Sequence, residues 1–190
     1  GPSNIVFLTQ EDESFYEQKV KENQDTSMVV EDEKHEPPTR LFRIDVDTKK
    51  TIRLTSNIDQ ITYLCASPNG KWAVTRHNRS LLYDFDSKIK PVMMLYDLVK
   101  GTSRPIFTEL NYNIAFVAWT NDNLGFYAVN NFNNNPRFSY PSVLHLHYYD
   151  LASQKSRQIE LDWPNGLAEQ DANEGKPDRK STRLNSSHRT

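Results

Sequence analysis

Ser67-Pro68-Asn69-Gly70-Lys71-Trp72 is the stretch that decides the fold, because it connects the end of one β-strand to the start of another. Proline fixes φ, while asparagine and glycine tolerate positive φ, so the stretch predicts a tight turn. The apolar run 61–66 precedes it, and Trp72 opens the next strand with a large apolar side chain. Fifty-three residues further on, 120–123 is a second turn, and Phe126 is expected to open a strand in the same way. The two turns predict the same strand pair one repeat apart.

A second feature keeps this spacing. Asp45, Asp97 and Asp150 each end an apolar strand and precede a polar turn, at intervals of 52 and 53 residues. Together the two features predict four strands in each period. For the middle period these are 61–66, 72–77, 92–98 and 105–109, for the last 114–119, 125–130, 143–151 and 156–162, and for the first 5–9, 40–46 and 51–55, with one further strand expected before Gly1.

Four antiparallel strands in roughly 40 to 50 residues are typical of a WD40-like propeller blade. The sequence therefore predicts an all-β fold, a partial β-propeller of about three blades of four antiparallel strands. A β-sandwich also has many short strands, but it would not repeat whole four-strand units. The predicted boundaries are an incomplete first blade with a long acidic loop (1–56), a second blade (57–110), a third blade (111–167) and a disordered tail (168–190).

The end of the chain differs from the rest in composition. Residues 178–190 are basic and serine-rich, and 178–188 resemble, codon for codon, a translated sequencing-library adapter. We expect 178–190 to be an artefact and the chain to be a fragment whose natural sequence ends near Pro177. Without these four basic residues and one acidic residue, 19 basic and 24 acidic residues remain, a formal net charge of −5. This charge predicts no nucleic-acid partner, and no run approaches the roughly 18 apolar residues of a membrane span.

The residues of the repeat resemble those of known bacterial propellers. The turn at 67–72 resembles the Ser-Pro-Asp-Gly-Lys-aromatic turn of bacterial propellers in the prolyl oligopeptidase family, the TolB-like proteins and the tricorn-type proteases. Segments 37–45, 95–98 and 161–167 are most similar to bacterial serine peptidases of the first family, of the dipeptidyl aminopeptidase and acylaminoacyl peptidase type. The third blade departs from the pattern, because 120–123 replaces the full turn. The resemblance covers about residues 5–167.

The resemblance implies an N-terminal propeller that restricts access of short peptides to a C-terminal α/β-hydrolase domain. That domain would carry the serine, aspartate and histidine of a serine peptidase. The chain contains no Gly-x-Ser-x-Gly, so no catalytic residue is expected in it. The alternatives are a non-enzymatic TolB-like propeller that binds proteins and a tricorn-type propeller. A bacterial source is implied, and periplasm and cytoplasm remain open.

Few residues are candidates for chemistry. His77 and Arg79, at the end of a strand beside a long loop, are the substrate-contact candidates, against a turn with local hydrogen bonds. The acid run 11–13 indicates either solvated loop acids or, by the resemblance, carboxylates that hold a substrate's amino terminus. No cofactor and no metal are expected: His145 and His147 share a strand face without a third ligand, and Cys65 is the single cysteine.

Overall fold

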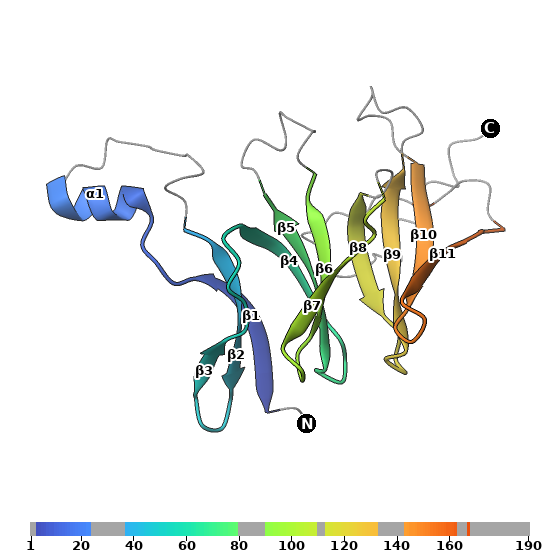
Figure 1. The fold of residues 1–190 in the computed structure, drawn as a ribbon, viewed down its shortest axis with the longest axis horizontal. Helices are drawn as coiled ribbons and strands as arrows, with labels where there is room; N and C mark the ends of the chain where they lie inside the picture. Colours follow the sequence, from blue (N-terminus) through green and yellow to red (C-terminus); the bar gives the residue numbers. More distant parts are fainter. Residues whose placement is uncertain are drawn as a thin grey trace, which may run out of the picture.

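The computed structural model describes residues 3–23, 37–79, 90–109, 113–132, 143–162 and 167. These residues form three antiparallel sheets that stand side by side, here named blades 1, 2 and 3 in chain order (Figure 1). The prediction of an all-β fold with three propeller-like blades is confirmed. The predicted tail, 168–190, lies outside the described residues.

Blade 1 has three strands in the order β1 (Asn4–Gln10), β2 (Thr39–Asp45) and β3 (Thr51–Arg53). Blades 2 and 3 have four strands each, in sequence order across the sheet. The first strand of blade 2 contacts β1 and β2 on one side and the first strand of blade 3 on the other. The strands are β4 (Gln60–Ala66), β5 (Trp72–Asn78), β6 (Val92–Asp97) and β7 (Thr102–Ile106) in blade 2, and β8 (Ile114–Trp119), β9 (Gly125–Phe132), β10 (Val143–Asp150) and β11 (Lys155–Ile159) in blade 3.

Each of the periodic aspartates closes the turn that follows its strand, and this is why an aspartate recurs once in each blade. Asp45 Oδ1 accepts from the Thr48 N–H at 2.7 Å, and Asp150 Oδ1 accepts from the Ser153 N–H at 2.7 Å. Asp97 Oδ1 accepts from two successive N–H groups, those of residues 99 and 100. Carboxylates that bond to turn N–H groups in this way replace the ladder bonds that the chain gives up as it reverses.

The turn after Asp97 also explains why β7 begins earlier than the sequence predicted. Gly101 has a φ of +68°, and its N–H donates to the Asp97 carbonyl at 2.9 Å. The reversal is complete at Gly101, so the strand starts at Thr102 and ends at Ile106, and not at the predicted 105–109.

These turn aspartates predict an acid-dependent stability. The backbone N–H of Thr48 holds the pKa of Asp45 below its usual value, and the Ser153 hydroxyl and N–H do the same for Asp150. A lowered folded pKa contributes stability above the unfolded value of about 4, and this is lost as the pH falls through the folded pKa. We expect the free energy of unfolding in urea to fall between about pH 5 and pH 2. The Asp45→Asn, Asp150→Asn variant should show a shallower fall; an identical slope would contradict the assignment.

The turns at 67–72 and 120–125 prove to be the same structure in two sequences. Asn69 and Asp122 each accept a backbone N–H two residues on through Oδ1, at 3.0 Å. Gly70 and Asn123 both adopt positive φ, +67° and +60°. The third blade therefore keeps the turn although its residues differ.

This equivalence corrects the expected match between Trp72 and Phe126. The Ser67 N–H bonds to the Trp72 carbonyl, and the Thr120 N–H bonds to the Gly125 carbonyl. Trp72 corresponds to Gly125, and Phe126 lies one residue later, on the opposite face of its strand, because side chains alternate along a strand.

Two apolar clusters hold the blades together. The cluster between blades 2 and 3 centres on fully buried Val74, Leu95 and Phe126, and the cluster between blades 1 and 2 on Leu41 and Ala73. Hydrogen bonds also cross the interface between blades 2 and 3. Tyr63 Oη accepts the Val117 N–H at 3.1 Å, and Trp119 Nε1 donates to the Cys65 carbonyl at 3.0 Å. Burial raises the pKa of Tyr63, so its hydroxyl stays protonated at neutral pH.

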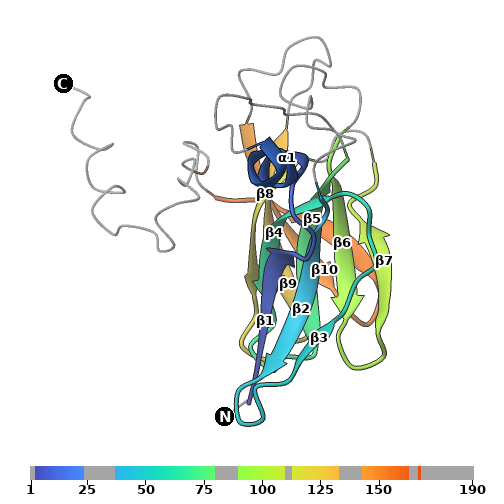
Figure 2. The same cartoon turned by 90° about the vertical axis from the view of Figure 1, so that its left-hand side faces the viewer.

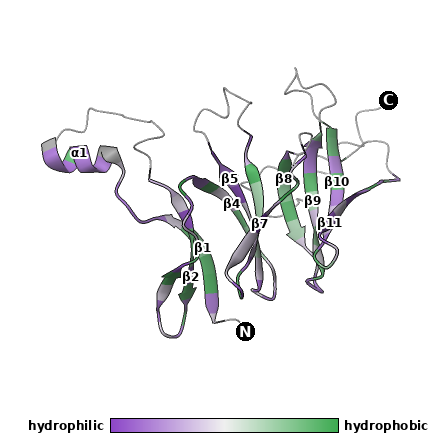
Figure 3. Cartoon of the chain, viewed as in Figure 1, coloured by the Kyte–Doolittle hydropathy of each residue, from purple (hydrophilic) through white to green (hydrophobic). Residues whose placement is uncertain are grey.

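β1, β5 and β9 end, and β2, β6 and β10 begin, at one edge of the molecule, so the β1–β2, β5–β6 and β9–β10 connections start and finish there (Figures 1 and 2). The first connection carries helix α1 (Phe15–Asn23), which the sequence did not predict. Ser14 and Glu17 start the helix with a capping box: Ser14 Oγ accepts the Glu17 N–H, and Glu17 Oε2 accepts the Ser14 N–H at 2.8 Å. The helix is mostly hydrophilic (Figure 3), and among the described residues no helix is long and apolar enough to cross a membrane.

Candidate functional site

A groove of about 490 Å³ lies between blades 1 and 2 on the side of the third and fourth strands. It brings together both predicted contact residues, His77 and Arg79, with Asp59 and Tyr96. Its other lining residues come from the β3–β4 connection, from β6 and β7, and from the turn between these two strands. We refer to it below as the inter-blade groove.

His77 is the centre of the polar contacts in the groove. Its Nδ1 lies 2.8 Å from Asp59 Oδ1, and its Nε2 lies 3.1 Å from Thr75 Oγ1 and 3.2 Å from Tyr96 Oη. The carboxylate of Asp59 accepts hydrogen bonds, so we assign the proton to Nδ1 and the acceptor role to Nε2. Burial, and next the negative charge of Asp59, raise the pKa of Tyr96 to about 12, so its hydroxyl remains available as a donor to the ring.

Asp59, His77 and Thr75 have the connectivity of an acid–histidine–hydroxyl triad, but their burial argues against hydrolysis. A nucleophilic hydroxyl must reach the substrate carbonyl. Thr75 is 0% exposed and His77 is 4% exposed, so no substrate can reach the hydroxyl or the ring nitrogen bonded to it. The arrangement links the β3–β4 connection to β5 and β6, and it stabilises the packing of blade 2 on that connection.

Arg79 is placed differently from His77. It is exposed, and its Nη2 donates to the Lys90 carbonyl at 3.0 Å, where β6 approaches. Its side chain lines the groove and is open to solvent, whereas both ring nitrogens of His77 already have partners. A substrate contact by either residue stays a prediction, and the geometry favours Arg79.

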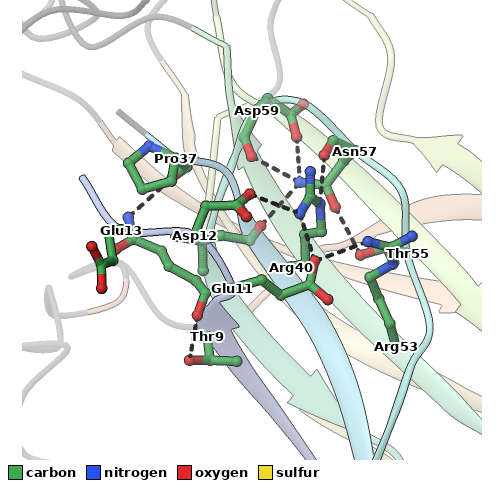
Figure 4. Close-up of polar contacts among 12 residues, drawn as sticks. Thr9, Glu11, Asp12, Glu13, Pro37, Arg40, Arg53, Thr55, Asn57 and Asp59 are labelled. Atoms are coloured by element: carbon green, nitrogen blue, oxygen red, sulfur yellow. Dashed lines mark hydrogen bonds and ion pairs between the residues drawn. The ribbon is translucent and has the colours of Figure 1, made fainter. Parts of the chain in front are cut away.

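Asn57 anchors Asp59 and connects the site to blade 1 (Figure 4). Its Nδ2 donates to the carbonyls of Thr39 and Asp59 at 2.9 and 2.8 Å and lies 2.9 Å from Asp59 Oδ1. Its Oδ1 accepts from Thr55 Oγ1, which itself accepts the Leu41 N–H of β2. Every polar atom of the Asn57 side chain is therefore used to hold the chain between the two blades.

The acid run also takes part in blade 1 (Figure 4). Glu11 Oε2 accepts from Arg40 Nη1 at 2.6 Å and from Arg53 Nη1 at 2.9 Å, and Arg40 Nε donates to the Asn57 carbonyl. The Arg53 hydrogen bond and, more weakly, Arg40 hold the pKa of Glu11 below its usual value, against the effect of burial. Since Glu11 already binds two guanidinium groups, it fixes the departure of the first connection and is not a free carboxylate for a substrate amine.

The sequence did not single out Asp59, Asn57 or Tyr96. The one available signal was Asn57-x-Asp59 directly before β4, a pattern common in turns that bond to their own backbone.

Among the residues that the structure describes, no three His, Cys, Asp or Glu side chains gather as they would around a metal ion. His147 is buried, and burial lowers its pKa.

Comparison with known proteins shows a likeness of fold to solved structures. No protein-family model and no curated protein matches the chain. The tricorn protease crystal structure is 19% identical over 64% of this chain and 11% of its own, with a TM-score of 0.51. Pyrococcus horikoshii acylaminoacyl peptidase is 9% identical over 83% of this chain and 23% of its own, also at 0.51. TolB from Acinetobacter baumannii is 18% identical over 65% and 27%, at 0.45.

The chain thus spans 11% of the tricorn protease and 23% of the acylaminoacyl peptidase, both at a TM-score of 0.51. At such low identities the likeness is one of fold. The described blades have the architecture of part of a β-propeller.

Proposed function

We propose that the chain is part of the propeller of a serine peptidase, where it limits the entry of short peptides to an α/β-hydrolase domain outside this sequence. The observation that carries the proposal is the fold likeness to the acylaminoacyl peptidase, which extends over 83% of this chain. The tricorn protease, at the same TM-score, is also by name a protease. Segments 37–45, 95–98 and 161–167 support the serine peptidases by their resemblance.

The geometry suits a gating role better than a chemical one. The connection-bearing edge carries α1 and receives the ends of β1, β5 and β9 (Figure 1). Loops that leave one edge of a rigid scaffold form the surface that usually meets substrates or other domains. In the proposed enzyme the propeller excludes large substrates by size and the hydrolase domain performs the reaction. Arg79, beside this edge, is the proposed substrate contact.

The test is to determine the sequence of the source gene downstream of the codon for Pro177 and to express the longer protein that it encodes. We expect a Gly-x-Ser-x-Gly sequence followed by aspartate and histidine, labelling by a fluorophosphonate, and hydrolysis of dipeptidyl or acylaminoacyl p-nitroanilides. The 190-residue chain is the matched control and should neither be labelled nor hydrolyse these substrates.

A reading frame that adds blades and then stops would contradict the proposal and support the TolB-like protein-binding alternative. Hydrolysis by the 190-residue chain itself would contradict the claim that it carries no catalytic group.

A further inference from the structure

A pocket of about 310 Å³ lies between blades 2 and 3, and neither the inter-blade groove nor the proposed function makes use of it. The turns that border it, after β6 and after β10, lie at the edge of the molecule opposite the β5–β6 and β9–β10 connections (Figure 1). Six of its lining residues decide what it can bind: Trp72, Leu95, Asp97, Lys100, Arg104 and Leu151. We refer to it below as the Arg104 pocket.

Arg104 is the unusual residue of this pocket, because part of its charged group is shielded from solvent without a partner. Its Nε and Nη2 are buried, and neither has a hydrogen-bond partner among the residues that the structure describes. A buried polar group without a partner costs free energy, and a cation costs more than a neutral group. An acceptor from outside the chain would remove this cost, because these two N–H groups form one edge of the guanidinium and together fit the two oxygens of a carboxylate.

The guanidinium is able to turn this edge towards a ligand. Arg104 as a whole is half-buried, and its side chain lines the pocket. Because Nε and Nη2 make no bond to the described part of the chain, rotation of the side chain breaks none there. Arg104 differs in this respect from His77, whose ring nitrogens are both held by partners.

The internal repeat shows that packing alone does not require an arginine at this position. Arg104 pairs with Leu95, two residues before the turn aspartate of blade 2. The residue at that place in blade 1 pairs with Ile52. In blade 3 the position holds Arg157, whose guanidinium carbon lies 5.4 Å from the centre of the ring of its strand partner Tyr148. An apolar residue is therefore sufficient for the fold, and Arg104 faces leucine where its counterpart in blade 3 has an aromatic ring.

The charges that line the pocket favour an anion. Lys100 and Arg104 are basic and Asp97 is acidic, which gives the lining a formal charge of +1. Asp97 is already engaged: its Oδ1 accepts the N–H groups of residues 99 and 100, and its Oδ2 lies 3.9 Å from Lys100 Nζ. The charge of Arg104 is therefore the one that an arriving anion would meet.

The rest of the wall is apolar, which restricts the class of anion. Leu95 belongs to the cluster between blades 2 and 3, and Trp72 and Leu151 pack against that cluster. Ligand pockets commonly combine such an apolar lining with a few polar groups that fix the orientation of the ligand. A molecule that fits both parts carries an oxyanion next to an apolar group.

We propose that the Arg104 pocket binds a small organic carboxylate, with both oxygens on Arg104 and the apolar part against Trp72 and Leu151. The inference goes beyond the proposed function and does not depend on it. The pocket lies away from the edge where peptides would enter, and all of its lining residues belong to this chain.

Calorimetric titration of the 190-residue chain tests the proposal, with 4-phenylbutyrate as the probe. We expect a Kd of about 1 mM at constant ionic strength, and at least about tenfold weaker binding of the neutral 4-phenylbutyramide and of inorganic phosphate. Arg104→Leu should weaken the binding of 4-phenylbutyrate by at least about tenfold. Arg157→Leu is the matched control, because it removes the same charge from the equivalent position of blade 3 and should leave the affinity unchanged.

Stability gives a readout that a merely structural arginine would not produce. Without ligand, Arg104→Leu should unfold at the same urea concentration as the unchanged chain or at a higher one, because leucine leaves no buried N–H group without a partner. Saturating 4-phenylbutyrate should raise the midpoint of the unchanged chain and of Arg157→Leu, and should not raise that of Arg104→Leu.

Four results would overturn the proposal. Equal binding of the acid and its amide would show that the pocket does not recognise the charge, and equal binding of phosphate would show that the apolar wall plays no part. A folded Arg104→Leu with unchanged affinity would place the ligand elsewhere. A large loss of stability in Arg104→Leu without ligand would make Arg104 a structural residue. The comparison of acid and amide uses the unchanged chain, so it decides the matter even if Arg104→Leu does not fold.

Discussion

Gly125→Ala is expected to destabilise the protein by about 4 kcal/mol, the largest effect of any single methyl group that the structure allows us to predict. A Cβ at this position would lie 2.5 Å from Tyr148 Oη and closer still to the Tyr149 backbone carbonyl. Backbone cannot move aside as the end of a flexible side chain can, so β9 and β10 would have to separate. The measurement is the free energy of unfolding in guanidinium chloride, followed by tryptophan fluorescence.

The need for glycine follows from a difference between two equivalent blades. The position in blade 2 is Trp72, whose side chain packs against the apolar cluster between blades 2 and 3. In blade 3 the ring of Tyr148 lies over Gly125 from the neighbouring strand, where blade 2 has Leu95. An aromatic ring that covers a strand glycine leaves no room for a Cβ.

Gly101→Ala is the matched control. Gly101 has a φ of +68°, and a Cβ there would meet nothing within 4 Å. Its replacement should cost only about 1 kcal/mol, the cost of a left-handed conformation. Equal losses for the two variants would show that close contact does not explain Gly125.

The repeat could be predicted from the sequence because its causes are local. Asp45, Asp97 and Asp150 bond to N–H groups two or three residues away, so the turn leaves a mark within a short window. Helix α1 had an equally local mark, Ser14 and Glu17, but the acidic and polar composition of residues 10–39 favoured a loop. Composition averages over a segment, whereas a capping box depends on two positions.

The partners of His77 could not be predicted in this way. Asp59 lies 18 residues before it and Tyr96 lies 19 residues after it, in different elements. Their meeting depends on the β5–β6 register and on the path of the β3–β4 connection between two blades. A strand-end histidine beside a long loop has the same sequence pattern whether it bonds to a buried partner or faces solvent.

His77→Leu is expected to lower the free energy of unfolding by about 3 kcal/mol, because leucine has a similar volume and no hydrogen-bonding atoms. Asp59 would lose the ring N–H, and the Thr75 hydroxyl, which is 0% exposed, would lose its acceptor. A buried hydroxyl without a partner costs more than the net value of the bond that it once made. Arg79→Ala, at an exposed position in the same groove, should change stability by less than about 0.5 kcal/mol.

A double-mutant cycle separates lost bonds from lost packing. Thr75→Val removes the orphaned hydroxyl with almost no change in shape, so the loss in His77→Leu, Thr75→Val should be smaller than the sum of the two single losses. Additive losses would mean that the ring acts by filling space alone.

If His77 contacts a substrate in the longer protein, that role must be compatible with this buried network, because the ring nitrogens that would bind substrate already hold blade 2 on the segment that follows blade 1. Arg79 is exposed and does not take part in the hydrogen bonds of His77. Loss of activity in Arg79→Ala at unchanged stability would therefore identify a substrate contact and not a folding defect.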